Sequence, residues 1–157
     1  MDEPQDRLPA ELVRALGDDA LGPPDQPAFL LVTTDEDGGP RISMLSVGEL
    51  LVHDERTLRV ALWPGTRTAG NLGRGGTALL AAVSPGSVTY VWTRPARLIV
   101  PEDAGLECFE LTATVARADA HAGMPVTSGI TFRAEDQEQA VASWRRQRDL
   151  LADARRE

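Results

Sequence analysis

The chain has 157 residues, of which 42% are hydrophobic and 25% are charged, and its formal net charge is −8. This length and balance predict one globular domain with its own core, and the acidic surplus disfavours non-specific binding to nucleic acid or to an anionic membrane. The single cysteine, Cys108, excludes an intrachain disulfide framework.

All 16 basic side chains are arginines, because the sequence contains no lysine. Schiff-base enzymes, pyridoxal-phosphate lysine enzymes and P-loop NTPases each require a lysine, so these three classes are excluded. If the chain binds an anionic cofactor, arginine side chains and backbone N–H groups must hold it. The acidic stretch 1–12 lacks the pattern of a signal peptide, and no apolar run approaches the ~20 residues that span a bilayer. The expected location is the cytoplasm.

The chain begins with a short helix over 8–16 and an irregular linker over 18–27 that is rich in Pro and Asp. Strands and turns then alternate until a closing helix over about 135–155, whose acidic start and basic end suit the helix dipole. The strands are expected over residues 28–34, 41–47, 49–53, 58–63, 77–83, 87–100, 107–120 and 126–133. Gly48 is expected at a bulge or bend, and Pro95 at a bulge or an edge.

Six or more short strands with helices at the two ends and in one crossover predict a mainly β fold, a small antiparallel barrel. We expect a single domain over 1–157, in which residues 1–27 form the N-terminal helix and linker. Residues 28–133 form the barrel, and residues 134–157 form the C-terminal helix.

The polar turn 66–72 is the first candidate site. Thr66, Arg67 and Thr68 bring hydroxyls, a cation and unpaired N–H groups to the start of a helix, which is the chemistry that binds a phosphate. The alternative is a surface crossover in which Thr66 only caps the helix. The spacing of Gly65 and Gly70 suits a P-loop, but the Lys-Ser/Thr that a P-loop requires is missing.

The strand over 41–47 is the second candidate. Alternation places Arg41 and Ser43 on one face, from which they are able to hydrogen-bond a ligand beside the turn. The alternative is an edge strand with one wet face. Trp63 ends a strand at the turn, where its indole is able to stack on a flat ligand.

The remaining reactive side chains are interpreted as structural or solvent-exposed. His53 lies in a turn and His121 in a loop, and neither has a metal ligand at suitable spacing. Cys108 is expected to be a small core residue. Because side chains offer little chemistry of their own, a bound cofactor is expected to carry any reaction.

With these elements in place, the chain resembles the FMN-binding split-barrel proteins related to pyridoxamine 5'-phosphate oxidase, over residues 27–120. The similarity is carried by the hairpin segment DGGPRISMLS and by the turn TRTAGNL that leads into an apolar strand. The resemblance implies a six-stranded antiparallel split barrel and a homodimer with FMN at the subunit interface.

The resemblance also implies which residues contact the flavin. On the second strand Arg41, Ser43 and Ser46 would border it. The ring or ribityl chain would meet Leu62 and Trp63. The phosphate would be held by Thr66, Arg67 and Thr68, with Asn71 in a structural place in the turn.

Two departures qualify this expectation. Thr68 and Ser46 stand where the oxidase pattern has lysines, so one phosphate cation is missing and the ligand is bound more weakly or differs, with FAD or a deazaflavin as alternatives. The charged C-terminal helix replaces the oxidases' substrate-binding segment, so true pyridoxamine-phosphate oxidase activity is not expected. The sequence predicts a flavin-dependent oxidoreductase acting on a small substrate, or else a non-catalytic binding or dimeric interaction module; a β-barrel binding protein unrelated to flavin is a third reading.

Overall fold

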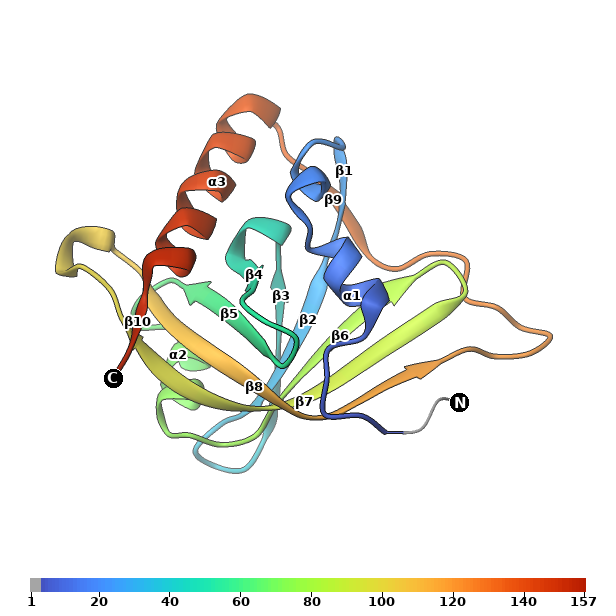
Figure 1. Cartoon of the computed structure of the whole chain (residues 1–157), viewed down its shortest axis with the longest axis horizontal. Coiled ribbons are helices and arrows are strands. Elements are labelled where there is room, and N and C mark those ends of the chain that lie inside the picture. Colours follow the sequence, from blue (N-terminus) through green and yellow to red (C-terminus); the bar gives the residue numbers. More distant parts are fainter. Residues whose placement is uncertain (1–3) are drawn as a thin grey trace.

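In the computed structural model, which describes residues 4–157, one long antiparallel sheet curls on itself to form a split barrel (Figure 1). The first three residues of the acidic N-terminal stretch lie outside this range. The strands follow the spatial order β3-β2-β6-β7-β8-β5-β4. Their bounds are β2 (Phe29–Thr34), β3 (Pro40–Leu45), β4 (Leu50–Val52), β5 (Thr57–Leu62), β6 (Ala78–Ser84), β7 (Ser87–Ile99) and β8 (Glu107–Asp119). The expected mainly β split barrel is confirmed; its six strands of six or more residues are joined by the three-residue β4.

Burial alternates along β2, whereas β5 is buried on both faces. In β2, Phe29, Leu31 and Thr33 point into the barrel and are buried, whereas Leu30 and Val32 point outward and are half-buried. Such alternation is typical of a sheet with one face on the core. By contrast, every residue of β5 is buried, because α3 (Gln137–Asp153) packs over this part of the sheet.

The outward face of the sheet carries apolar side chains in register across several strands. Ile42 on β3 pairs with Val32 on β2, Val32 with Leu79 on β6, and Leu79 with Trp92 on β7. A second row pairs Met44 with Leu30. We call this surface the outer apolar face; it comprises Leu30, Val32, Ile42, Met44, Leu79, Tyr90 and Trp92. The Ile42 and Met44 side chains are its most exposed members, at 64% and 63%.

The helices close the barrel at its edges. α1 (Ala10–Ala15) packs into the main core through Leu12, and α2 (Arg67–Gly73) lies near the hairpin of β2 and β3 (Figure 1). α3 contributes Trp144 to the main core and Leu151 to a second apolar cluster with Ala61, Leu98 and Cys108. Asp136 caps α3, since its side chain accepts the N–H of Gln139 at 3.1 Å. Trp144 of α3 packs on Gly48, where any Cβ would collide with the indole. Gly48 lies in a 3₁₀ turn, η2 (Val47–Glu49), which is the bend that the sequence predicted. The absence of a side chain at this position lets Trp144 approach closely.

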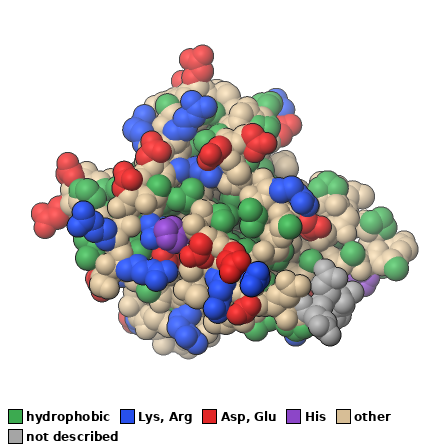
Figure 2. Space-filling view, in the orientation of Figure 1, with side chains coloured by type: hydrophobic (Ala, Val, Ile, Leu, Met, Phe, Trp, Pro, Cys, Tyr) green, Lys and Arg blue, Asp and Glu red, His purple; other side chains and the backbone are tan. Residues whose placement is uncertain are grey.

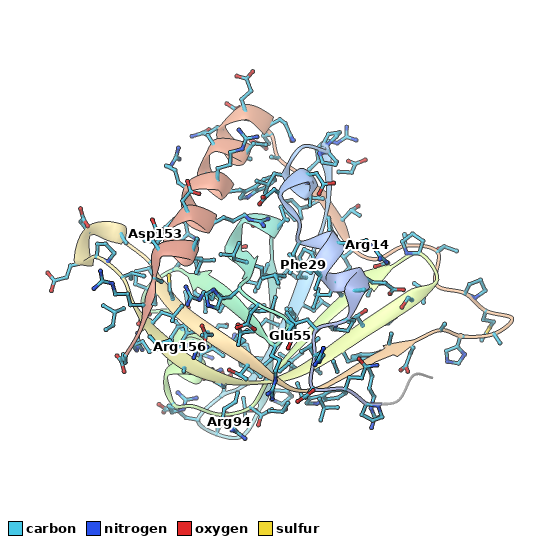
Figure 3. All side chains as sticks on the ribbon, viewed as in Figure 1. Arg14, Phe29, Glu55, Arg94, Asp153 and Arg156 are labelled. Atoms are coloured by element: carbon cyan, nitrogen blue, oxygen red, sulfur yellow. The ribbon has the colours of Figure 1, made fainter. Side chains whose placement is uncertain are left out.

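A buried guanidinium fastens the C-terminal helix to the barrel. The Arg59 side chain is 4% exposed; it donates to Glu110 at 3.1 Å and to the carbonyl of Leu151 at 2.8 Å. Arg156 reaches the same Glu110 carboxylate at 2.7 Å, and its position at the end of the tail is visible in Figure 3. Because buried charges are tolerated only when paired, this cluster fixes where α3 ends.

Several short elements were not predicted. The linker expected over 18–27 contains a 3₁₀ turn, η1 (Asp18–Leu21), and a strand, β1 (Asp25–Pro27). β1 pairs with β9 (Thr131–Arg133), which is only the last part of the strand expected over 126–133. A further 3₁₀ turn, η3 (Glu102–Ala104), precedes β8, and β10 (Arg155–Arg156) pairs with β7.

Pro95 occupies an edge position, which was one of its two expected settings. The pairing of β6 with β7 ends at Thr93, so Pro95 has a neighbouring strand only on the β8 side, opposite Leu111. A proline is tolerated there because no ladder hydrogen bond is required of its nitrogen. The bulge in this ladder lies between Trp92 and Thr93 instead.

No helix within residues 4–157 is long and apolar enough to cross a membrane. On the face drawn in Figure 2, acidic and basic side chains are interspersed rather than gathered into a patch of one sign.

Cys108 is 1% exposed, as the sequence predicted, and burial raises the pKa of its thiol to about 11. Since the thiolate is the reactive species, we expect no alkylation by iodoacetamide of the native protein at neutral pH. Mass spectrometry should show complete alkylation once the protein is unfolded in guanidinium. Rapid alkylation of the native protein would contradict this packing.

Candidate functional site

The turn between β2 and β3 holds an acidic side chain in a fixed place. The backbone N–H of Asp35 donates to the carbonyl of Gly39 at 2.8 Å, and Gly38 donates back to the carbonyl of Asp35 at 2.9 Å. Gly38 has a φ of 88°, which a residue with a Cβ rarely adopts. The tight turn therefore aims the Asp35 carboxylate at the first residues of β3.

Arg41 on β3 grips that carboxylate with two nitrogens. Its Nε donates to Oδ1 of Asp35 at 2.9 Å and its Nη2 to Oδ2 at 3.0 Å. Such two-point pairs are stronger and more directional than single contacts. The Arg41 hydrogen bonds, followed by that from Asn71, lower the pKa of Asp35 to about 2, so this carboxylate is ionised at neutral pH.

The turn between β5 and α2 forms the opposite side of the site. Gly65 has a φ of 75°, and its N–H donates to the Glu107 carboxylate at 3.2 Å. Thr66 caps α2: its hydroxyl accepts the N–H of Ala69 at 3.2 Å and donates to the carbonyl of Trp63 at 3.1 Å. The Thr66 hydroxyl is thus committed to the turn.

Arg67 is the cation of this turn that faces solvent. Its side chain is exposed, and within residues 4–157 it makes neither a hydrogen bond nor an ion pair. It lies close enough to Asp35 to lower the pKa of that carboxyl further. Trp63, next to the turn, is 65% exposed.

A buried polar seam joins α2 to the hairpin. The Asn71 amide nitrogen donates to Thr33 at 3.0 Å and to Asp35 at 2.8 Å. Thr68 and Ser43 share a hydroxyl contact of 2.5 Å. Since Asn71 and Thr68 are each only 6% exposed, these bonds satisfy polar atoms that water does not reach.

Between the hairpin and α2 lies an open pocket of about 530 Å³. Its lining is polar and charged, and consists of Asp35, Glu36, Asp37, Gly65, Thr66, Arg67, Gly70, Asn71 and Arg74. Arg74 turns toward the protein, where it donates to the carbonyl of Thr34 at 3.1 Å and to the side-chain oxygen of Asn71. Arg67 is therefore the guanidinium most available to a ligand.

The structure brings most of the predicted site residues together, but not all of them. Arg41, Ser43, Thr66, Arg67, Thr68 and Asn71 lie around the seam and the pocket. Ser46 lies beyond the end of β3, where it caps η2 with Glu49. Leu62 is 5% exposed and belongs to the core. Trp63 is exposed next to the turn. For each of these predicted residues, a contact with a flavin stays a prediction.

Sequence reasoning missed Asp35. The run DEDGGP reads as a turn, and its acidic residues suit a turn whether or not they contact anything else. The signal available was the hairpin register, which places Arg41 opposite Thr33, two residues from Asp35. From the sequence, Arg74 is one arginine that could compensate for the cation missing at Thr68; in the structure it donates to Thr34 and Asn71.

The other reactive groups lie away from the pocket. His53 contacts Arg59 at 3.3 Å, and within the described residues no group of His, Cys, Asp and Glu is arranged to hold a metal ion.

The chain is similar in sequence to one curated protein and in fold to several solved structures. No protein-family model matches the chain. The chain is 30% identical over 137 residues to the uncharacterized protein YclD of Bacillus subtilis, a match that covers 86% of this chain and 89% of YclD.

Three solved structures share the fold. A pyridoxamine 5'-phosphate oxidase-like protein from Lactobacillus delbrueckii is 16% identical with a TM-score of 0.56, and the match covers 72% of this chain and 95% of that one. An FMN-binding protein from Syntrophomonas wolfei is 13% identical with a TM-score of 0.54, over 71% and 86%. A protein named F420 reductase is 14% identical with a TM-score of 0.50, over 63% and 94%.

Asn71→Ala should lower the free energy of unfolding by about 1–3 kcal/mol, because it leaves buried polar atoms of the seam without partners. Arg67→Ala on the same helix is the matched control, and should change stability by less than about 0.5 kcal/mol, as surface substitutions usually do. Urea denaturation measures both. An equal loss of unfolding free energy in the two variants would contradict a stabilising role for the hydrogen bonds of the seam.

Proposed function

We propose that this chain, which belongs to the same family as YclD and has the split-barrel fold of the pyridoxamine 5'-phosphate oxidase-related superfamily, is a flavoprotein. FMN is the ligand that we favour, with FAD or a deazaflavin as alternatives on the same site. The names of two proteins with this fold, an FMN-binding protein and an F420 reductase, support a ligand of this class.

The observation that carries the proposal is Arg67. Within residues 4–157 its exposed guanidinium makes no hydrogen bond or ion pair, and it lines an open pocket. The exposed indole of Trp63 precedes the same turn but is not part of the pocket lining. A guanidinium binds phosphate oxygens at two points, and an indole offers an apolar surface to a flat ring. The turn therefore carries the two kinds of side chain that a phosphorylated flavin requires.

The contribution of the turn to phosphate binding rests on side chains more than on the helix. α2 has only seven residues, so its dipole is small. The Thr66 and Thr68 hydroxyls already serve the cap and the seam. We therefore assign the phosphate contact to Arg67, with Thr66 and Gly70 shaping the pocket around it.

A bound flavin would supply the electron or hydride transfer, which no side chain of this pocket provides. The nine lining residues include no histidine, cysteine or tyrosine to serve as a proton donor or acceptor. The chain's own part is to hold the phosphate, orient the ring and limit the access of water. The substrate is a small molecule that the flavin oxidises or reduces.

The same lack of proton-transferring side chains favours one alternative, a non-catalytic flavin-binding module. Reduction of the bound flavin by a nicotinamide cofactor would support the oxidoreductase. A flavin that is bound but is not reduced would support the module. In either case the expected location is the cytoplasm.

A second copy of the chain is the proposed partner. The outer apolar face exposes Ile42 and Met44 next to half-buried aromatic and aliphatic side chains, and contiguous apolar surfaces of this kind are typical of protein interfaces. β3 carries both this face and, on its other side, Arg41 and Ser43. A dimer through the face would place the partner subunit against the outer side of the strand that carries Arg41 and Ser43.

The flavin assignment is tested by the absorbance spectrum of the purified protein, with and without added FMN, after desalting. We expect retained flavin bands at roughly 450 and 370 nm from the bound isoalloxazine. Arg67→Ala should weaken FMN binding by about ten- to hundredfold, the range for loss of one charge-assisted contact.

Arg145→Ala, an exposed arginine of α3, is the matched control and should leave FMN affinity unchanged. Failure of FMN to bind at all, or equal binding by the Arg67 variant, would overturn the assignment.

The dimer is tested by Met44→Asp, which places a charge on the exposed β3 part of the outer apolar face. We expect light scattering after gel filtration to give the mass of a dimer for the native protein and of a monomer for the variant. Val13→Asp, on α1 and away from the face, should remain dimeric. A native protein that is monomeric would contradict the proposal.

A further inference from the structure

We propose that Asp35 limits the affinity of the pocket for the phosphate of its ligand, so that the flavin is bound as an exchangeable ligand. The inference rests on the proposed function, and it deepens it by naming the residue that sets how tightly the phosphate is held. Asp35 is a specificity-determining residue here rather than a catalytic one.

The Asp35 carboxylate is held in a fixed place. Two backbone hydrogen bonds of the hairpin turn, at 2.8 and 2.9 Å, hold residue 35 on the pocket rim. The Asp35 side chain is 21% exposed, so solvent screens it only in part. A phosphate entering the pocket meets this negative charge without being able to push it into open solvent.

Asp35 also occupies donors that an anion would otherwise use. It takes both Arg41 contacts, at 2.9 and 3.0 Å, and one N–H of the Asn71 amide at 2.8 Å. Three N–H groups that converge on one carboxylate resemble the donor set of an oxyanion site. The protein's own carboxylate is therefore a competitor of the ligand's phosphate.

The balance of charge around the pocket also disfavours tight binding of a phosphate. Asp35 neutralises Arg41, and Arg74 is directed to Thr34 and Asn71, which leaves Arg67 to offset a phosphate that carries close to two negative charges. A pocket designed for tight retention of that group would be expected to hold more cations than carboxylates. This pocket is instead lined by three carboxylates and two guanidiniums.

Asp35 is also the one acidic residue of the lining that engages these donors. The Glu36 side chain is 83% exposed and reaches only Arg74, at 3.5 Å, while Asp37 accepts the N–H of Gly39 within the turn. Because Arg41 and Asn71 hold the pKa of Asp35 at about 2, protonation does not relieve the competition at neutral pH.

The test compares the affinities of FMN and riboflavin, which differ by the phosphate alone. Each is titrated by flavin fluorescence at fixed ionic strength against the native protein, Asp35→Asn, Asp35→Ser and Glu138→Gln. Asp35→Ser keeps a hydroxyl that is able to accept the Asn71 amide, in case the asparagine variant disturbs the turn. Thermal melting verifies that each variant is folded.

We expect Asp35→Asn and Asp35→Ser to bind FMN about tenfold more tightly, and to release it more slowly, because a unit charge near the phosphate is removed. Riboflavin affinity should change by less than about twofold. Glu138→Gln, at an exposed position of α3 outside the pocket, should behave like the native protein, since its charge is screened by solvent.

Unchanged or weaker FMN binding by both folded Asp35 variants would overturn the inference, as would an equal gain for riboflavin. If no form binds FMN, it is the proposed function that fails. Calorimetric titration with inorganic phosphate then tests the role of Asp35. Tighter phosphate binding by the Asp35 variants than by the native protein supports that role, and equal phosphate binding overturns it.

Discussion

The side chain of Asn71 is the contact on which the candidate site depends, because both halves of the site share it. Its amide nitrogen donates to Thr33 and Asp35 of the hairpin, and its oxygen accepts from Arg74. A buried amide is stable only when its donors and acceptor are all satisfied, so α2 docks on the hairpin in one orientation. That orientation in turn fixes where Arg67 stands relative to Asp35.

The chemistry of the pocket follows from this docking and from a sequence without lysine. One arginine is held by a carboxylate, a second is turned inward, and a third is left to a ligand. An arginine that is bound at two points is a rigid structural element, whereas an unpaired one is a binding group. The site is thus built to recognise an anion with modest strength, and it leaves redox chemistry to the molecule that brings the anion.

The sequence predicted the parts of this structure that leave a local pattern. The hairpin around Asp35, the turn before α2 and the capped helix that begins at Gln137 all have turn or cap residues at fixed spacing. The pairing of β1 with β9 was not predictable, because each strand has three residues and they are joined across most of the chain. Within the site, Arg41 was identified, but its partner Asp35 was not, since an aspartate suits a turn equally well without any contact.

The central claim is that a flavin phosphate is held at Arg67 between the hairpin and α2. A crystal structure of the protein grown with FMN tests it most directly. The account predicts density for the phosphate within hydrogen-bond distance of the Arg67 guanidinium, in the pocket that Thr66 and Gly70 border. A flavin whose phosphate lies elsewhere, with Arg67 still facing solvent, would contradict it.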